Sequence, residues 1–156
     1  MSNLTKGLKS GTIAGLAYGV VNAILAYIIL IELRSSIIAA LNKYLSQHSN
    51  LISISAQNLY DLALITAPVA EIIVGIILGL IFGTLFGIMY NKIPFSSPVG
   101  KGLLFSFFIW LILNVGIEAA NIGTYGFTYY IVSAGLSLIG VVVYGLLLGY
   151  LYGRGT

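Results

Sequence analysis

Very few side chains in this 156-residue chain could do chemistry. The sequence contains four acidic residues, one histidine and no cysteine. Without cysteine it cannot form disulfides, thiolate nucleophiles or cysteine-ligated metal centres. The single histidine, His48, has no second metal ligand at a useful spacing, so no metal site is expected. Nucleophile–base pairs and phosphate-binding loops are also missing from the sequence, which predicts a protein without enzymatic activity and without a cofactor.

The composition predicts the surroundings of the remaining polar side chains. Hydrophobic residues make up 59% of the chain and charged residues 7%, and the mean hydropathy is +1.05. Because a soluble domain carries about 25% charged residues, a water-soluble globule is excluded and the apolar surface must face lipid. The seven Lys and Arg residues form no cluster, so nucleic-acid binding is not expected.

Four apolar stretches are long enough for transmembrane helices, which need about 20 residues at 1.5 Å each. These stretches cover residues 10–31, 68–90, 103–120 and 129–152. The sequence therefore predicts an all-α integral membrane bundle of four transmembrane helices, which forms one domain over residues 1–156.

The insertion at 32–67 is expected to lie on the outer surface. Its residues 33–47 place apolar side chains along one helical face, which predicts an amphipathic helix that lies in the lipid interface or caps the bundle. A polar loop is expected at 48–55. Helix should resume near Ala56 and either kink or start afresh at Pro68, because proline lacks the backbone N–H.

The basic residues predict the orientation of these helices. One side of the bundle receives two bases and all four acids, whereas the other receives five bases and no acid: Lys6, Lys9, Lys92, Lys101 and Arg154. The asymmetry predicts a multi-pass protein of the cell membrane, with both termini and the 91–100 turn in the cytoplasm.

The chain also carries signs of an internal duplication. A shift of 92 residues superimposes Lys9 on Lys101, Tyr18 on Trp110 and Asn22 on Asn114. A shift of 62 superimposes Phe82, Gly83, Gly87, Tyr90 and Lys92 on Tyr144, Gly145, Gly149, Tyr152 and Arg154. The first span thus matches the third and the second matches the fourth. We expect two parallel-repeat hairpins, about 1–93 and 94–156, related by a pseudo-twofold axis along the membrane normal.

The fourth span contains the pattern Tyr-Gly-x3-Gly-x2-Tyr-x-Arg between Tyr144 and Arg154, with a partial copy in the second span. This pattern resembles small four-helix integral membrane proteins of prokaryotes whose function is unknown. The abundant isoleucine and the eleven tyrosines without cysteine also resemble the membrane proteins of thermophilic archaea. The resemblance implies the four-span plan and no catalytic residue.

Three spans carry glycine at every fourth position, which we call glycine ladders. The ladders comprise Gly7, Gly11, Gly15 and Gly19; Gly75, Gly79, Gly83 and Gly87; and Gly145, Gly149 and Gly153. This spacing keeps glycines in one stripe and allows helix backbones to approach closely, so we favour packing over conduction. Three stripes exceed what one small bundle needs, which predicts that at least one packs against another subunit.

The carboxylates of Glu71 and Glu118 are expected near the outer ends of spans, where two interpretations stay open. They pair with Arg34 or Lys43 or cap helices, or they form the mouth of an ion-binding site. Glu71 is expected about 29 Å along the helix from Tyr90, at the outer edge. Rotary-ATPase proteolipids have similar glycine ladders and duplicated hairpins but need a carboxylate near mid-membrane, so a rotor assignment is rejected.

The deepest strongly polar side chains are expected to be Asn22 and Asn114. Their equivalent positions in the two halves predict a pair near the pseudo-twofold axis. An interhelical asparagine hydrogen bond in lipid contributes about 1 kcal/mol, which favours a structural role. A substrate site is the alternative.

Together these features favour a structural or accessory subunit of a larger membrane complex, for which a bioenergetic complex is the best-known setting. Its expected partners are the lipid bilayer and other membrane subunits, in a homo- or hetero-oligomer. The main alternative is a small channel or transporter whose path is lined by Asn22, Asn114, Glu71 and Glu118. A membrane protein of a virus or vesicle is a third possibility.

Overall fold

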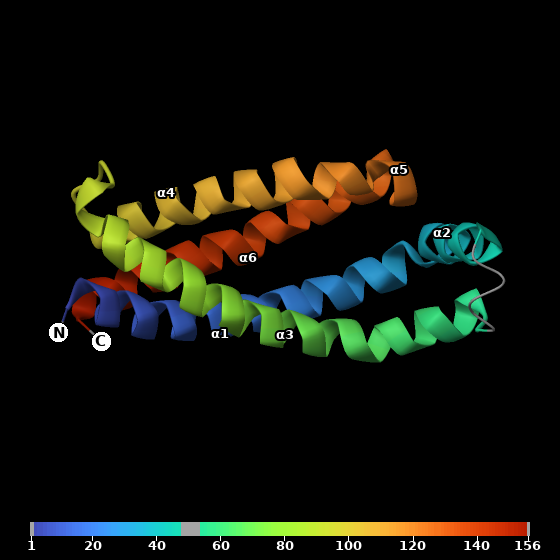
Figure 1. The fold of residues 1–156 in the computed structure, drawn as a ribbon, viewed down its shortest axis with the longest axis horizontal. Coiled ribbons are helices and arrows are strands. Elements are labelled where there is room, and N and C mark those ends of the chain that lie inside the picture. Colours follow the sequence, from blue (N-terminus) through green and yellow to red (C-terminus); the bar gives the residue numbers. More distant parts are fainter. Residues whose placement is uncertain (1, 48–53, 156) are drawn as a thin grey trace.

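The computed structural model of the protein describes residues 2–47 and 54–155, and these are helical with no strand among them. Two antiparallel hairpins lie side by side (Figure 1). Helix α1 (Asn3–Glu32) pairs with α3 (Ala56–Met89), and α4 (Pro98–Trp110) pairs with α6 (Phe127–Arg154). Both termini and the α3–α4 connection lie at one end, which we call the terminal end. Helix α2 (Arg34–Gln47) lies at the opposite end, the α2 end.

Three helices are long and apolar enough to cross a membrane: α1, α6, and α3 with the short helix η1 (Tyr90–Lys92). Helix α4 is apolar but shorter, and the chain continues as a π-helix, η2 (Leu111–Ile117). It then forms two short turns of helix, η3 (Glu118–Asn121) and α5 (Ile122–Tyr125). The prediction of a helical, membrane-type protein is thus confirmed, whereas the third predicted span, residues 103–120, is not one regular α-helix.

Helix α3 differs from expectation at Pro68. The helix begins at Ala56, as predicted, and is capped by Ser55, whose Oγ accepts the N–H of Asn58 at 3.1 Å. It then continues through Pro68, which lies twelve residues inside it. Of the two alternatives expected at Pro68, a kink or a fresh start, the structure excludes the fresh start. A proline in a membrane-type helix removes only one backbone hydrogen bond, and neighbouring helices tolerate this.

The backbones of α1 and α3 are in contact where their glycine ladders meet. A Cβ added to Gly15 would lie 2.6 Å from the Cα of Gly79, and a Cβ added to Gly75 would lie 2.6 Å from the Cα of Gly19. Real Cβ atoms essentially never come so close to backbone atoms. The absence of side chains at these positions is therefore what brings the two helices together.

The third glycine ladder faces α4. A Cβ added to Gly149 would lie 2.6 Å from the Cα of Val99, and one added to Gly145 would lie 2.9 Å from the Cα of Leu103. Each of the three ladders consequently faces a helix of the same chain. The reason for expecting one of them to pack against another subunit, that the ladders exceed the needs of this bundle, therefore does not hold.

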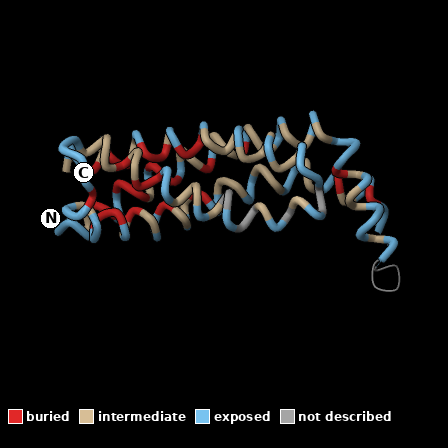
Figure 2. The backbone as a smooth tube through the Cα atoms, turned by 90° about the horizontal axis from the view of Figure 1, so that it is seen from above, coloured by how far each residue is buried: buried red, intermediate tan, exposed pale blue. Residues whose placement is uncertain are grey.

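The best-packed part of the molecule lies toward the terminal end, where Figure 2 shows most of the buried residues. Four rings from three helices and η1 form an aromatic cluster there: Phe86, Tyr90, Phe105 and Tyr152. The ring centroids of Tyr90 and Tyr152 lie 4.2 Å apart. The Nζ of Lys101 lies 4.2 Å above the Tyr90 ring and donates to the Tyr90 carbonyl at 2.7 Å. This cluster closes the space between the hairpins at the terminal end.

At the α2 end, helix α2 forms where the amphipathic helix was predicted and buries Ile37. Arg34 donates from Nη2 to Oε1 of Gln57 at 3.2 Å, and its guanidinium carbon lies 5.5 Å from the centre of the Tyr60 ring. The Tyr60 hydroxyl in turn donates to the Leu30 carbonyl at 2.8 Å. These contacts join α2 and the start of α3 to the end of α1. Residues 48–53 of the predicted loop, with His48, lie outside the described residues.

Candidate solute site between the hairpins

A cavity of about 250 Å³ lies between the two hairpins. We call it the polar cavity, because a carboxylate, an amide and hydroxyl groups line it together with apolar side chains. Its lining residues come from α1, α3, η2 and α6: Tyr18, Asn22, Leu25, Ala26, Ile29, Glu71, Val74, Leu78, Leu113, Ser133 and Ser137. The residues from α1 extend from its middle to near its end at the α2 end. A cavity of this size has room for several water molecules.

Glu71 lies midway along the α1–α3 pair. A Cβ added to Gly19 would lie 2.8 Å from the Glu71 carbonyl oxygen, so the two residues are level. Gly19 is about 15 Å along α1 from Lys9 and about 20 Å from Glu32. Glu71 was expected at the outer edge because it lies about 29 Å along the helix from Tyr90. Helix α3 begins at Ala56, well before Glu71, so Glu71 does not lie at the end of its helix.

Glu71 also lacks the partners that a structural role would require. Among the side chains that the structure describes, which exclude those of Asn114 and Glu118, no hydrogen bond or ion pair engages its carboxylate. Its position in the middle of α3 rules out helix capping. Arg34, one expected partner, contacts Gln57 and Tyr60 instead. Tyr60 precedes Glu71 by eleven residues, or about 17 Å of helix. Among the described side chains, Glu71 therefore neither pairs with Arg34 nor caps a helix, and its pairing with Lys43 stays a prediction.

Asn22 lines the polar cavity and carries a buried amide oxygen beside it. Its Oδ1 accepts no hydrogen bond from the part of the chain that the structure describes. The side chain packs against α6 at Gly140, where an added Cβ would lie 3.2 Å from the Asn22 Cγ. A buried acceptor without a partner costs about 1–3 kcal/mol. The predicted pair with Asn114 stays a prediction, because the side chains of Asn114 and Glu118 lie outside the described residues.

Two serines of α6, Ser133 and Ser137, line the polar cavity although their residue type did not single them out. The Oγ of Ser137 accepts the indole N–H of Trp110 at 2.9 Å and donates to the Ala134 carbonyl at 2.9 Å. Serines in membrane helices commonly bond their own carbonyls, so their type alone is uninformative. The informative signal was the shift of 62 residues, which superimposes Glu71 on Ser133.

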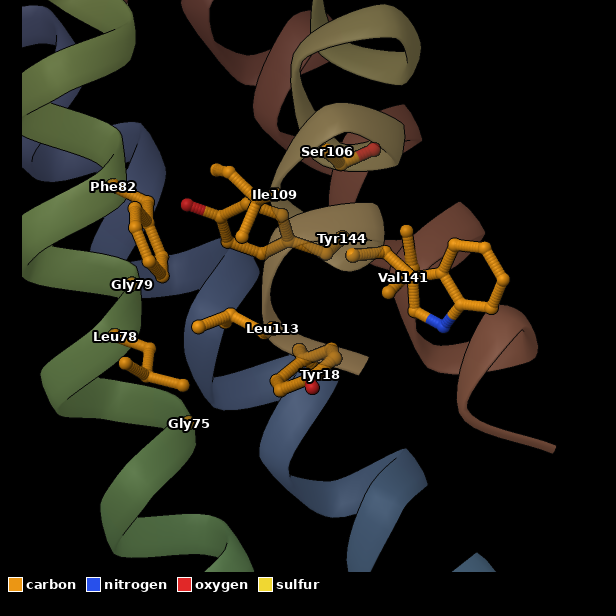
Figure 3. Close-up of a pocket in the computed structure, with 11 residues that line it drawn as sticks. Tyr18, Gly75, Leu78, Gly79, Phe82, Ser106, Ile109, Leu113, Val141 and Tyr144 are labelled. Atoms are coloured by element: carbon orange, nitrogen blue, oxygen red, sulfur yellow. The ribbon is translucent and has the colours of Figure 1, made fainter. Parts of the chain in front are cut away.

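A smaller apolar pocket of about 30 Å³ adjoins the polar cavity on its terminal side and shares Tyr18, Leu78 and Leu113 with it. Figure 3 shows the Tyr144 side chain reaching from α6 toward Phe82 of α3. Tyr144 is only 6% exposed, and its hydroxyl has no hydrogen-bond partner among the described residues. A polar atom thus lies between the polar cavity and the aromatic cluster.

The polar groups that meet in the polar cavity are one carboxylate, one amide and three hydroxyls, which offer both acceptors and donors. Such a set can hold a cation or a polar solute. Among the described residues, no group of three or more His, Cys, Asp or Glu side chains could hold a metal ion.

No protein-family model matches this chain, and no curated protein or solved structure is significantly similar to it. The functional argument therefore depends on the geometry of the molecule.

Proposed function

We propose that this membrane protein is a small channel or carrier that binds a polar solute in the polar cavity and moves it across the bilayer without catalysing a reaction. The observation that carries the proposal is the position of Glu71. Its carboxylate lies midway along the helix pair, borders a cavity and has no partner among the described residues. An ionisable group at such a depth is costly and is a functional site by default.

The two ends of the molecule are packed differently, which supports a solute path that is open toward the α2 end and closed at the terminal end. The polar cavity follows α1 from Tyr18 to Ile29, toward the α2 end. In the other direction the aromatic cluster and Leu148, which is fully buried, fill the space between the hairpins. A solute would therefore enter from the α2 end, and release at the terminal end would require the aromatic cluster to separate.

The duplication that we propose is supported by equivalent backbone contacts in the two hairpins. Gly83 approaches Gly11 in the first hairpin, and Gly145 approaches Leu103 in the second. Shifts of 62 and 92 residues relate these two contacts. The same shifts relate the contact of Gly87 with Gly7 to that of Gly149 with Val99.

A pseudo-twofold axis between these hairpins would pass through the polar cavity. Glu71 and its equivalent, Ser133, both line the polar cavity. The equivalent rings of Tyr90 and Tyr152 stack on each other. Transporters built from repeats commonly bind their substrates where the repeats meet.

The orientation follows from the charges at the two ends. The terminal end carries five bases and no acid, so we propose that it faces the cytoplasm and that the polar cavity extends toward the outside.

The accessory-subunit function is the weaker proposal. It depended on a glycine ladder left free for another subunit, and each ladder faces a helix of its own chain. Exposed apolar side chains on α3 and η2, such as Ile65 (71% exposed) and Ile112 (65% exposed), fit contact with lipid as well as contact with a subunit.

The test is solute flux into liposomes that contain the purified full-length protein. We expect flux of at least one cation above that of empty liposomes, and we expect Glu71→Gln to reduce it at least tenfold. Glu32→Gln, which changes an exposed acid at the α2 end, should leave the flux unchanged. Absence of flux for alkali cations, organic cations, anions and neutral solutes alike would overturn the proposal, as would full flux by Glu71→Gln.

A further inference from the structure

We propose that the solute held at Glu71 is a small protonated alkylamine, a cation that carries N–H donors on an apolar body. This inference deepens the proposed function and rests on it for the location of the site.

The charge of the polar cavity determines the sign and number of charges on its ligand. Glu71 is the only charged residue among the eleven described residues that line the cavity. A carboxylate that stays ionised away from water requires a compensating charge nearby. A monovalent cation neutralises the site, whereas a divalent cation would leave an excess positive charge and an anion would be repelled. The ligand is therefore a monovalent cation.

The size and walls of the polar cavity argue against a bare metal ion. Hard metal cations require about six oxygen ligands within about 2.5 Å. A cavity of about 250 Å³ is far larger than such a shell, and six of its eleven lining residues are aliphatic or alanine. Val74, Leu78 and Leu113 would gain from contact with an apolar ligand body. A cation with its own hydrocarbon part fits this lining better than a metal ion does.

The acceptors in the polar cavity favour a cation with N–H groups. The buried Oδ1 of Asn22 has no donor among the described residues, and the Glu71 carboxylate also only accepts. An ammonium group offers N–H donors to both atoms, as a quaternary ammonium does not. The ring of Tyr18, which also lines the polar cavity, offers a face on which a cation is attracted.

Trp110 provides a fluorescent reporter for the test. It is the only tryptophan in the chain, and it donates to Ser137, which lines the polar cavity. The purified full-length protein in detergent is titrated with n-butylammonium chloride at constant ionic strength while the emission of Trp110 is recorded. We expect a saturable change with n-butylammonium. Sodium, potassium, tetramethylammonium and neutral 1-butanol should each need at least tenfold higher concentrations for the same change.

Four variants separate the proposed contacts from general effects on folding. Glu71→Gln should raise the Kd for n-butylammonium at least tenfold, whereas Glu71→Asp should stay within about threefold of the wild-type Kd because the charge is kept. Asn22→Leu should raise the Kd several-fold, and Glu32→Gln should bind as the wild type does. Gel filtration and the far-ultraviolet circular dichroism of each variant report whether it is folded.

The outcomes distinguish this inference from the proposed function. Equal or tighter binding of sodium, potassium or tetramethylammonium would overturn the alkylamine assignment, and flux of those ions into liposomes would still support the proposed function. Wild-type binding of n-butylammonium by folded Glu71→Gln would overturn the inference directly, as would the absence of any response by folded wild-type protein to n-butylammonium. Binding as expected without flux into liposomes would support the inference and contradict transport.

Discussion

At the scale of single residues, two buried polar atoms without hydrogen-bond partners support the position of the proposed solute site. The Oδ1 of Asn22 and the hydroxyl of Tyr144 are both buried without a hydrogen bond from the described part of the chain. Each such group costs about 1–3 kcal/mol. Both residues line the space between the hairpins, so the molecule gives up stability where a polar solute would lie.

Replacing Tyr144 by phenylalanine should therefore stabilise the protein. We expect Tyr144→Phe to raise the free energy of unfolding by about 1 kcal/mol, because it removes a buried hydroxyl without a partner. Tyr60→Phe is the matched control, since its hydroxyl donates to Leu30 at 2.8 Å and its removal should cost about 1 kcal/mol. Thermal unfolding in detergent measures both. A loss of stability in Tyr144→Phe would contradict this account of the site.

The sequence identified Asn22 and Glu71 as candidates but misjudged the surroundings of Glu71. Its position was counted from Tyr90, and the count could not show that α3 runs through Pro68 and begins at Ala56. The contribution of Ser133 was missed because a serine in a membrane helix needs no partner outside its own helix. Residue type and spacing can suggest which groups are polar and deep, but the neighbours on other helices decide which of them share a cavity.

At the scale of elements, glycine determines which helices touch. The spacing of four residues predicted three packing faces, and the structure brings the ladders of α1 and α3 against each other and that of α6 against α4. The spacing of the glycines shows which face of their own helix is free of side chains, but not which helix packs against that face. The partner of each face therefore could not be predicted from the glycines of a single helix.

A single methyl group in the α1–α3 contact should separate the two helices. We expect Gly11→Ala to lower the free energy of unfolding by about 2–3 kcal/mol, because its Cβ would overlap the backbone of Gly83. Gly135→Ala is the matched control on α6, where nothing lies within 4 Å of an added Cβ. Unfolding of the two variants in a denaturing detergent compares their stabilities. Equal stability of Gly11→Ala and wild type would contradict the close contact.

At the scale of the whole molecule, composition predicted a helical membrane protein, and the charge pattern predicted that most basic residues lie at one end and the acidic residues at the other. The terminal end, with its bases, and the α2 end lie opposite each other, as the charge pattern requires. The polar cavity could not be predicted in this way. It depends on how the hairpins pack against each other, with an aromatic cluster filling the terminal end and a space left toward the α2 end.

The proposed orientation can be tested with single cysteines, because the natural chain contains none. We expect Ser2→Cys and Ser96→Cys, at the terminal end, to react with an impermeant thiol reagent only after the cell membrane is opened. Ser46→Cys, at the far end of α2, should react in intact cells. The reverse pattern would contradict the proposed orientation, and reaction of all three in intact cells would contradict a membrane-spanning arrangement.

The central claim is that solute and water reach Glu71 through the polar cavity, and the most direct test is the reactivity of a cysteine beside it. Ser133→Cys lines the polar cavity, whereas Gly135→Cys lies on an open face of the same helix. With a cationic, impermeant thiol reagent added outside, we predict rapid modification of Ser133→Cys, slowed by n-butylammonium, and almost none of Gly135→Cys in the lipid. An unreactive Ser133→Cys, or equal reactivity at the two positions, would contradict the account.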